Sequence, residues 1–448
     1  MSKRKKQDVS NLGTRDTFSS RWGFVLACVG SAVGMGNIWL FPYRVGQFGG
    51  FAFLVPYFIC IFLLGFTGVI EEMTFGRAMK TGPLGAFKKA MEKRGKKNGD
   101  VIGLIPVIGS LAIAIGYSVV VGWIIKFLFG AFVGDLVKTT DSTAYFGEIA
   151  GTFGSVPWHL IALALTFIIM SVGISKGIEK VNKILMPAFF VLFIILAIRV
   201  PFLDGASKGY EFLFTSDWSK LLSPKTWIYA LGQSFFSLSL AGSGTVVYGS
   251  YLKDSENVVK ASRSIAIFDT LAASLAALVI IPSVFAFGMK PTAGPPMLFI
   301  TMPEVFKKMP LGQMFSIIFF IAVLFAGITS LINLFETPIE ALQDKFKLSR
   351  KKSVSIIAII GVVVGLLIEN VEVMGKWMDV VSIYVIPLGA LLAAIMFFWV
   401  CGDKFVKDEI GKGLDGEVPK FIIPLGKYVF CGLTILVLIL GILWGGIG

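Results

Sequence analysis

The residue with the clearest chemical consequence is an aspartate inside an apolar stretch. Asp269 lies in the run IAIFDTLAASLAALVII, which is apolar enough to lie within a membrane. A lone carboxylate is costly to bury there, so Asp269 should have a cationic partner. No lysine or arginine lies nearby within the apolar segments, which makes a bound metal cation the economical partner. Asn37 and Ser237 supply neutral, hard oxygens that suit Na⁺ better than a transition metal.

Two adjacent hydroxyls form a second candidate cation site. Thr329 and Ser330 lie in the middle of the apolar run FAGITSLINLF. Such hydroxyls often bond back to the preceding turn of their own helix. A second oxygen-lined cation site is about as good an interpretation, because a broken apolar segment is expected opposite them. The sequence leaves both open.

That broken segment is 21–43, RWGFVLACVGSAVGMGNIWLFPY. It is apolar enough to cross a membrane, yet its middle gathers small and polar residues: Gly30, Ser31, Gly34, Gly36 and Asn37. Glycine lowers the cost of leaving the helix, and unwound backbone is tolerated in a membrane only where it is buried or lines a cavity. A small-residue packing face would explain the glycines but not Asn37. The segment therefore predicts a broken membrane helix whose break is a binding site.

A second segment of the same kind is 227–252, WIYALGQSFFSLSLAGSGTVVYGSYL, with SLSLAGSG at its middle. It lies five apolar spans after the first. Interrupted spans at matching places in two halves are typical of inverted-repeat transporters. In that arrangement the half-helix N-termini can bind an anion and the half-helix C-termini can bind cations.

The whole chain has the composition of a polytopic helical membrane protein. Of its 448 residues, 55% are hydrophobic and 15% are charged. Apolar runs of membrane-spanning length recur throughout, and they are continuous instead of alternating, which favours helices over a barrel. We predict eleven spans at 21–46, 51–77, 102–133, 156–174, 177–200, 225–252, 259–288, 311–345, 354–370, 380–400 and 424–447.

The net charge of +13 does not indicate nucleic-acid binding, because the basic residues gather in alternate loops. Eight lysines and arginines lie between residues 77 and 97, and five lie between 345 and 352. By the positive-inside rule this places the tail 1–20 in the cytoplasm and the C-terminus outside. No cleavable signal peptide is visible. No protein partner is indicated beyond the lipid bilayer.

The four cysteines show neither metal-ligand spacing nor a disulfide framework: Cys28, Cys60, Cys401 and Cys431.

Four motifs carry a resemblance to a known family. They are the segment 21–43, GQSFFSLSL at 232–240, FAGITS at 325–330 and SKGIEKVNKILMP at 175–187. With them the chain resembles the neurotransmitter:sodium symporter family, in particular its bacterial amino-acid transporters, over nearly its whole length. The resemblance implies an all-α polytopic membrane protein of the LeuT-type fold. Eleven helices would form a 5+5 inverted repeat, with repeats at 21–200 and 225–400, helices 1 and 6 broken, and a last helix at 424–447.

The resemblance also implies a set of ligands, which we carry over to this chain. One Na⁺ would take the Ala32 carbonyl, Asn37, Ser237 and Asp269, together with the substrate carboxylate. The other Na⁺ would take the carbonyls of Gly30, Val33 and Ala326 and the hydroxyls of Thr329 and Ser330. The substrate carboxylate and ammonium would contact Ser31, Ala32, Met35, Gly36, Tyr117, Phe236, Ser237 and Ser239. The substrate side chain would lie among Ile113, Tyr117, Phe236, Gly242, Ser330 and Leu334.

Gates on both sides of the site follow from the same resemblance. Phe236 and Tyr117 would close the outer lid, and Arg15 with Asp344, beside Tyr251, would form the inner gate. The family commonly has an arginine where this chain has Leu40. We therefore hypothesise a shifted outer pair between Arg44 and Asp379.

The function implied is Na⁺-coupled import of an amino acid by alternating access across a prokaryotic plasma membrane, and not an enzymatic activity. Residues 241–244 carry no large side chain, so we predict tryptophan, tyrosine, phenylalanine or leucine as substrate. Asp269 stands where many members have asparagine. A fixed carboxylate there should make chloride unnecessary, and the resemblance implies two Na⁺ sites. Gly177 and Pro187 indicate either unwinding of the fifth helix or an ordinary kink.

Three other functions compete with this one. A proton-coupled carrier would use Asp269 as a titrating group. A membrane hydrolase would need the sole histidine, His159, which the sequence places at a span edge without companion ligands. A satisfied interfacial histidine is the better interpretation. A receptor that binds a substrate without transporting it is left open by the sequence.

Overall fold

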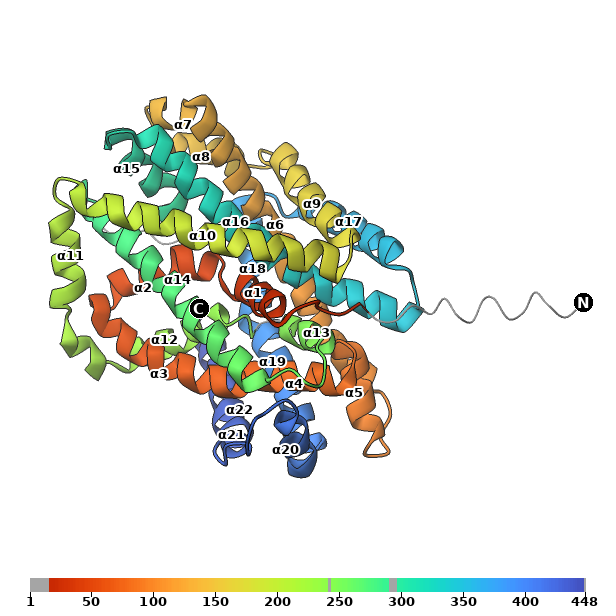
Figure 1. Ribbon diagram of the computed structural model, residues 1–448. Coiled ribbons are helices and arrows are strands. Elements are labelled where there is room, and N and C mark those ends of the chain that lie inside the picture. Colours follow the sequence, from red (N-terminus) through yellow and green to blue (C-terminus); the bar gives the residue numbers. More distant parts are fainter. Residues whose placement is uncertain (1–15, 241–242, 290–295, 447–448) are drawn as a thin grey trace, which may run out of the picture.

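The computed structural model describes residues 16–240, 243–289 and 296–446. Within these ranges the chain is helical and contains no β-strand. Each of the eleven predicted spans is helical in the structure. In Figure 1 the long helices pack side by side around α1, which contacts both α10 and α16.

The first five spans have the following bounds. Span 1 is α1 (Arg21–Ala32), η1 (Gly36–Leu40) and α2 (Phe41–Gln47). Span 2 is η2 (Gly50–Phe53), α3 (Leu54–Leu64), η3 (Gly65–Val69) and α4 (Ile70–Met79). Span 3 is α6 (Gly99–Val133), and span 4 is α9 (Val156–Ser171). Span 5 is η4 (Ile174–Glu179), α10 (Lys180–Arg199) and η5 (Val200–Phe202).

The remaining six spans follow in the same order. Span 6 is α12 (Pro224–Ser237) and α13 (Gly244–Ser250), and spans 7 to 9 are α14 (Val258–Ala286), α16 (Gly312–Phe346) and α17 (Arg350–Leu367). Span 10 is α18 (Val371–Val380), η8 (Val381–Val385), α19 (Ile386–Ala394) and η9 (Ile395–Val400). The last is α21 (Ile422–Pro424), η10 (Leu425–Phe430) and α22 (Cys431–Trp444).

Short helices occupy the connections between spans. On the side predicted to be cytoplasmic these are α5 (Pro83–Glu92) and α20 (Asp403–Gly411). On the other side they are α7 (Asp135–Lys138), α8 (Ser142–Ala150), α11 (Ala206–Thr215), η6 (Trp218–Leu222), η7 (Met297–Thr301) and α15 (Met302–Lys308).

Length and hydropathy alone select fewer spans than eleven. Seven described helices are long and apolar enough to cross a membrane, and the bent pair of span 1 makes eight. The other three predicted spans each depart from a plain apolar helix. α9 has 16 residues, α17 begins with three basic residues, and span 6 is interrupted. The described helices are therefore consistent with eleven spans.

The two predicted breaks are present. α1 ends at Ala32, and Val33 is extended with ψ of 102°. The chain resumes at Gly36, bent by 53° from α1. The Asn37 side chain accepts a hydrogen bond from Gly34 N–H at 3.0 Å, which replaces a lost helical bond. In span 6, Ser239 and Ser243 flank the break with left-handed φ values of 53° and 56°.

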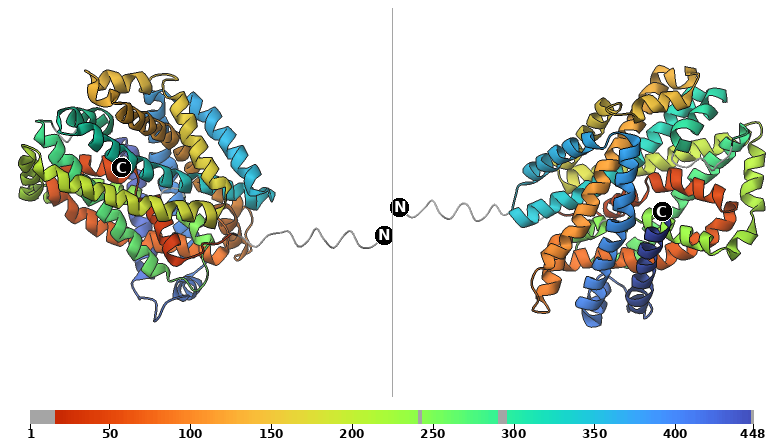
Figure 2. Two further views of the ribbon diagram at one scale, coloured as in Figure 1. Left: turned by 45° about the horizontal axis from the view of Figure 1, so that its top comes forward. Right: turned by 180° about the vertical axis from the view of Figure 1, so that it is seen from behind.

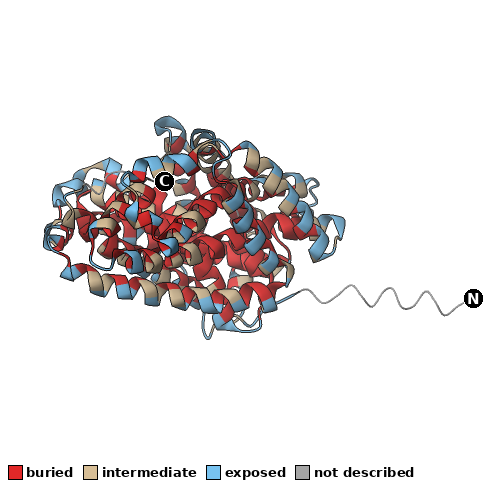
Figure 3. Cartoon of the chain, turned by 90° about the horizontal axis from the view of Figure 1, so that it is seen from above, coloured by how far each residue is buried: buried red, intermediate tan, exposed pale blue. Residues whose placement is uncertain are grey.

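Close approach of helices explains part of the glycine content. A Cβ on Gly30 would lie 2.1 Å from Asn182 Oδ1 of α10, and one on Gly244 would lie 2.1 Å from Asn333 Oδ1 of α16. The broken helices therefore sit directly against unbroken ones. Seen from above, buried residues fill the centre and exposed ones the periphery (Figure 3). From behind, α19 lies beside α6 (Figure 2).

Candidate functional site

Asp269 lies in a cluster of oxygen and amide groups beside both breaks. The Asp269 side chain is 0% exposed and accepts hydrogen bonds from Asn37 Nδ2 at 2.7 Å and from Ser237 Oγ at 2.9 Å. Asn37 Nδ2 is also 3.1 Å from Ser237 Oγ. Among the described residues no lysine or arginine forms an ion pair with Asp269. The structure thus brings together three predicted ligands that are up to 232 positions apart.

Sequence reasoning missed one member of this cluster. The hydroxyl of Tyr57, on α3, donates to Asp269 Oδ2 at 3.2 Å and lies 3.2 Å from Ser237 Oγ. Tyr57 is completely buried. It stands in a plain apolar run, so neither its neighbours nor its spacing distinguishes it from a packing residue.

A second cluster lies on the other side of the first break. Ser330 Oγ is 3.1 Å from the Gly30 carbonyl and 3.3 Å from the Val33 carbonyl. Thr329 Oγ1 donates to the Phe325 and Ala326 carbonyls of its own helix at 2.9 and 3.1 Å. Both interpretations of this hydroxyl pair therefore apply: Thr329 bonds back along α16, whereas Ser330 reaches the break.

The donor sets suit Na⁺. The first cluster offers carboxylate, amide and hydroxyl groups and the second offers hydroxyl and carbonyl oxygens, all of them hard ligands. The first holds a buried carboxylate without a cationic side chain beside it, and the second holds carbonyls released from helical bonding by the extended Val33. The described residues contain no group of three or more His, Cys, Asp or Glu side chains arranged for a transition metal.

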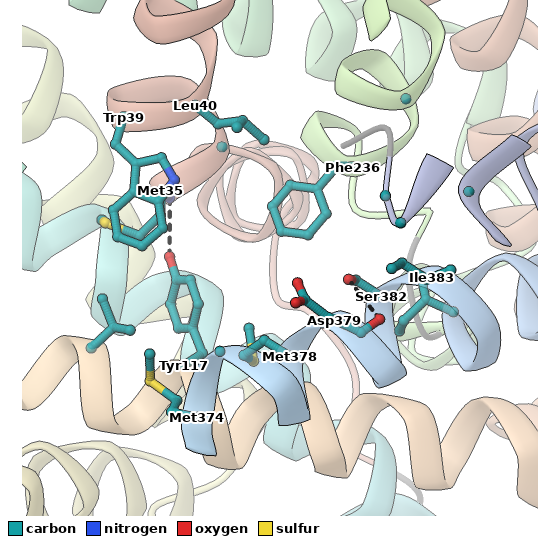
Figure 4. A pocket seen from close by; sticks show the side chains of 18 of the residues that line it. Met35, Trp39, Leu40, Tyr117, Phe236, Met374, Met378, Asp379, Ser382 and Ile383 are labelled. Carbon is teal, nitrogen blue, oxygen red and sulfur yellow. Dashed lines mark hydrogen bonds between the residues drawn. The ribbon is translucent and has the colours of Figure 1, made fainter. Parts of the chain in front are cut away.

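A cavity of about 430 Å³ adjoins the first break. Met35 and Gly36 of the break, Tyr117 of α6 and Phe236 of α12 line one part of it. Further aromatic and apolar side chains line the rest: Trp39, Trp123, Phe146, Phe299, Met374 and Met378. The Met35 N–H donates to the Tyr117 hydroxyl at 3.1 Å, the dashed line in Figure 4. The cavity therefore pairs backbone polar groups at the break with an apolar, aromatic wall.

Comparison with known proteins agrees with this geometry. A model of the sodium:neurotransmitter symporter family matches residues 15–149 and 145–443. The chain belongs to this family. It is thus a sodium-dependent membrane transporter and not an enzyme.

Individual relatives support the assignment. The chain is 34% identical over 395 residues to an uncharacterized sodium-dependent transporter, YhdH, of Bacillus subtilis, covering 84% of this chain and 86% of the relative. It is 35% identical to a sodium-dependent transporter of Haemophilus influenzae, covering 77% and 78%. The crystal structure of MhsT in complex with L-phenylalanine superposes with a TM-score of 0.85 at 33% identity, covering 95% of this chain and 99% of MhsT.

Other residues predicted for the symporter site lie apart from the cavity wall. Ile113 and Leu334 do not line the cavity, but they belong to an apolar cluster that also contains the cavity-lining residues Met378 and Ile386. Ser239 Oγ donates to the Ser31 carbonyl at 2.6 Å and so links the two breaks directly. Ala32, which ends α1, is buried at the break. Gly242 lies outside the described residues.

The predicted inner gate of the symporter is seen in part, because Arg15 lies outside the described residues. Asp344 accepts from Thr81 Oγ1 at 3.0 Å and pairs with Lys347 at 3.2 Å. The Tyr251 hydroxyl donates to Glu336 Oε1 at 2.8 Å. The structure adds a pair that sequence reasoning missed.

That pair joins Arg350 to Glu336. The Arg350 guanidinium binds both oxygens of Glu336, at 2.9 and 2.8 Å, and Glu336 is 0% exposed. Arg350 lies in the basic stretch between 345 and 352, but its partner lies fourteen residues earlier on another helix. The signal in the sequence was Glu336 itself, an acidic residue within the predicted span 311–345, comparable to Asp269 within its own span.

The hypothesised outer pair is not formed in this structure. Arg44 and Asp379 both line the cavity, as does Leu40. The Arg44 guanidinium lies 4.2 Å from the centre of the Tyr229 ring and donates to Gln47 Oε1 at 3.0 Å. No ion pair joins Arg44 to Asp379 within the described chain. The two charges share one cavity, so the pair remains a prediction for a more closed state.

Proposed function

We propose that this transporter is a Na⁺-coupled importer of a hydrophobic or aromatic L-amino acid, with two Na⁺ per substrate and no requirement for chloride. The observation that carries the proposal is Asp269: a completely buried carboxylate, without a cationic side chain, beside a helix break that opens on an aromatic cavity. A charge so placed requires a mobile cation.

The first Na⁺ would be held by Asp269, Asn37, Ser237 and the Ala32 carbonyl, and by the carboxylate of the substrate. The ion supplies a positive charge that both carboxylates share. Substrate and Na⁺ then bind more tightly together than apart, which is the thermodynamic basis of coupling. The fixed charge of Asp269 takes the place of a chloride ion.

The second Na⁺ would be held by the Gly30, Val33 and Ala326 carbonyls with Thr329 and Ser330. This set joins α1 to α16, so the ion would hold the broken helix against an unbroken one. Each Na⁺ that enters with the membrane potential gains about 2.3 kcal/mol per 100 mV, so two ions could drive strong accumulation.

The choice of substrate follows from the cavity. The Met35 and Gly36 amides and the Tyr117 hydroxyl would bind the substrate carboxylate, and Phe236 would cover the site. The walls carry six tryptophan or phenylalanine side chains and three methionines. Their charged members, Arg44 and Asp379, belong to the hypothesised outer gate. The bound L-phenylalanine of MhsT supports an aromatic substrate.

The arrangement in the membrane follows from charge. We place the transporter in a prokaryotic plasma membrane with its N-terminus in the cytoplasm and its C-terminus outside. The repeats 21–200 and 225–400 would face opposite ways across the bilayer and exchange access to the site between its two sides.

Uptake into proteoliposomes tests the proposal. We expect uptake of labelled phenylalanine that needs an inward Na⁺ gradient, is competed by tryptophan, tyrosine or leucine but not by glutamate or lysine, and persists in gluconate without chloride. Uptake driven by a pH gradient without Na⁺ would indicate a proton-coupled carrier instead. Na⁺-dependent binding without uptake would indicate a receptor.

A further inference from the structure

The histidine that the sequence placed at a membrane edge is completely buried between three helices. His159 of α9 is 0% exposed, and Glu369 and Ser118 are 1% and 0% exposed. His159 Nε2 lies 2.8 Å from Ser118 Oγ of α6, and Nδ1 lies 3.1 Å from Glu369 Oε1. None of the three residues lines the cavity. His159 therefore lies in the first turn of its span and its polar atoms are satisfied, as expected, but the side chain is enclosed by protein.

The hydrogen bonds determine where the protons lie. Ser118 has one hydroxyl proton, which it donates to the Ile115 carbonyl at 2.6 Å. Ser118 Oγ can then only accept from His159, so Nε2 carries a proton. Nδ1 and Glu369 Oε1 can form their hydrogen bond either with Nδ1 donating to a carboxylate or with Nδ1 accepting from a carboxylic acid.

The packing around the imidazole is close. A Cβ on Gly365 of α17 would lie 2.3 Å from His159 Cε1 of the ring, and a Cβ on Gly122 of α6 would lie 2.7 Å from the backbone nitrogen of His159. Helices α6, α9 and α17 thus meet at this residue. The imidazole packs directly against the α17 backbone, which leaves little space for a larger side chain.

Each end of the cluster adjoins the cavity. Ser118 follows Tyr117, whose hydroxyl binds Met35 N–H at the break. Glu369 precedes Asn370, the N-cap of α18, and α18 supplies Met374 and Met378 to the cavity wall (Figure 4). The hydrogen-bonded series from Ser118 through His159 to Glu369 therefore joins the segment that carries Tyr117 to the segment that begins α18.

We propose that His159 and Glu369 are positioning residues for substrate binding: they hold the start of α18 at a fixed distance from Tyr117. They touch neither substrate nor cation, so they act through the shape of the cavity. A hydrogen bond is needed at Glu369, but a charge is not. Glutamine can supply an N–H to Nδ1 in the same place, whereas leucine cannot.

The positioning role can be tested by measuring the kinetics of Na⁺-driven phenylalanine uptake. This assay rests on the proposed function. We expect Glu369→Leu to raise KM about tenfold, the upper end for a lost neutral hydrogen bond, with kcat within about twofold of wild type. Glu369→Gln should keep the wild-type KM. Thr166→Val is the matched control, because Thr166 is buried on the same helix and bonds only to Ala162 of that helix.

An unchanged KM in Glu369→Leu would overturn the proposal, and so would a fall in kcat alone, which indicates a general structural defect. A Glu369→Gln variant as impaired as Glu369→Leu would show that charge, not the hydrogen bond, matters. A second readout is independent of transport. Spin labels at positions 133 and 376, exposed on the outer end of α6 and on α18, should give a broader distance distribution in Glu369→Leu than in Glu369→Gln.

The two readouts separate the two proposals. If wild type shows no Na⁺-dependent uptake, the proposed function fails, but the spin-label distances still test the positioning role of His159 and Glu369. If uptake is as proposed but the distances and KM are unchanged in Glu369→Leu, the positioning role fails alone.

Discussion

Replacing Asp269 by asparagine separates a cation ligand from a merely buried acid. The substitution preserves shape and the capacity to accept from Asn37 and Ser237 but removes the charge. A charge-assisted contact contributes about 2 kcal/mol, so Asp269→Asn should weaken Na⁺ binding at this site about 30-fold. Basal stability without Na⁺ should not fall, because the variant buries one charge less.

These figures predict a thermal-shift result. Na⁺ at 100 times its dissociation constant stabilises the folded protein by about 2.7 kcal/mol per site. After a 30-fold loss the same concentration is only about three times the dissociation constant, which leaves about 0.9 kcal/mol. Unfolding of purified protein is therefore measured in Na⁺ and in K⁺, and the Na⁺-dependent part should shrink to about a third at this site, while the second site contributes as before.

Two further variants sharpen the comparison. Tyr57→Phe removes one hydrogen bond to Asp269 and no charge, so we expect a smaller loss of Na⁺ affinity, about fivefold. Glu71→Gln neutralises another completely buried carboxylate, on α4 and outside the candidate site, and should keep the full Na⁺ shift. The reasoning is refuted if Asp269→Asn keeps the full shift, or if Glu71→Gln loses as much.

Three other substitutions test the remaining parts of the site. Ser330→Ala should raise the Na⁺ concentration for half-maximal uptake at least fivefold, since its hydroxyl is lost from the second cluster; an unchanged Na⁺ curve would remove Ser330 from the ligand set. Gly34→Ala should abolish substrate binding, because the added Cβ would lie 2.8 Å from Ser330 Oγ and 3.0 Å from the Tyr117 hydroxyl. The control variant Gly432→Ala should bind substrate normally, because a Cβ there has no heavy atom within 4 Å. Glu336→Gln should lower stability by about 3 kcal/mol, because it leaves the Arg350 guanidinium buried without its charge partner; equal melting temperatures for wild type and variant would contradict this.

Several features of this transporter follow from local sequence. A span is a continuous apolar run, so its position can be counted along the chain. A break needs glycines and small polar residues within a few positions, which is why both breaks were expected where they occur. The expectation that Asp269 binds a cation is also local, because an acid within an apolar run has no partner among its neighbours.

Other features depend on residues far apart in the sequence. Tyr57 joins the Asp269 cluster across 212 positions, and His159 meets Glu369 across 210. Nothing in the spacing of either pair could indicate these contacts. The same holds for Arg44, whose guanidinium rests on Tyr229 instead of pairing with Asp379. The choice between such partners depends on helix packing, which brings one candidate within reach and keeps the other apart.

The sequence by itself thus determined that the chain crosses a membrane and where two of its helices break, because each of these depends on hydrophobicity and backbone freedom over a short stretch. It also predicted a cation at the acid beside the breaks, for the same local reason. The tertiary structure decided which side chains complete each cluster, which walls bound the cavity, and that the sole histidine lies inside the protein. Those outcomes depend on contacts that form only when distant helices pack.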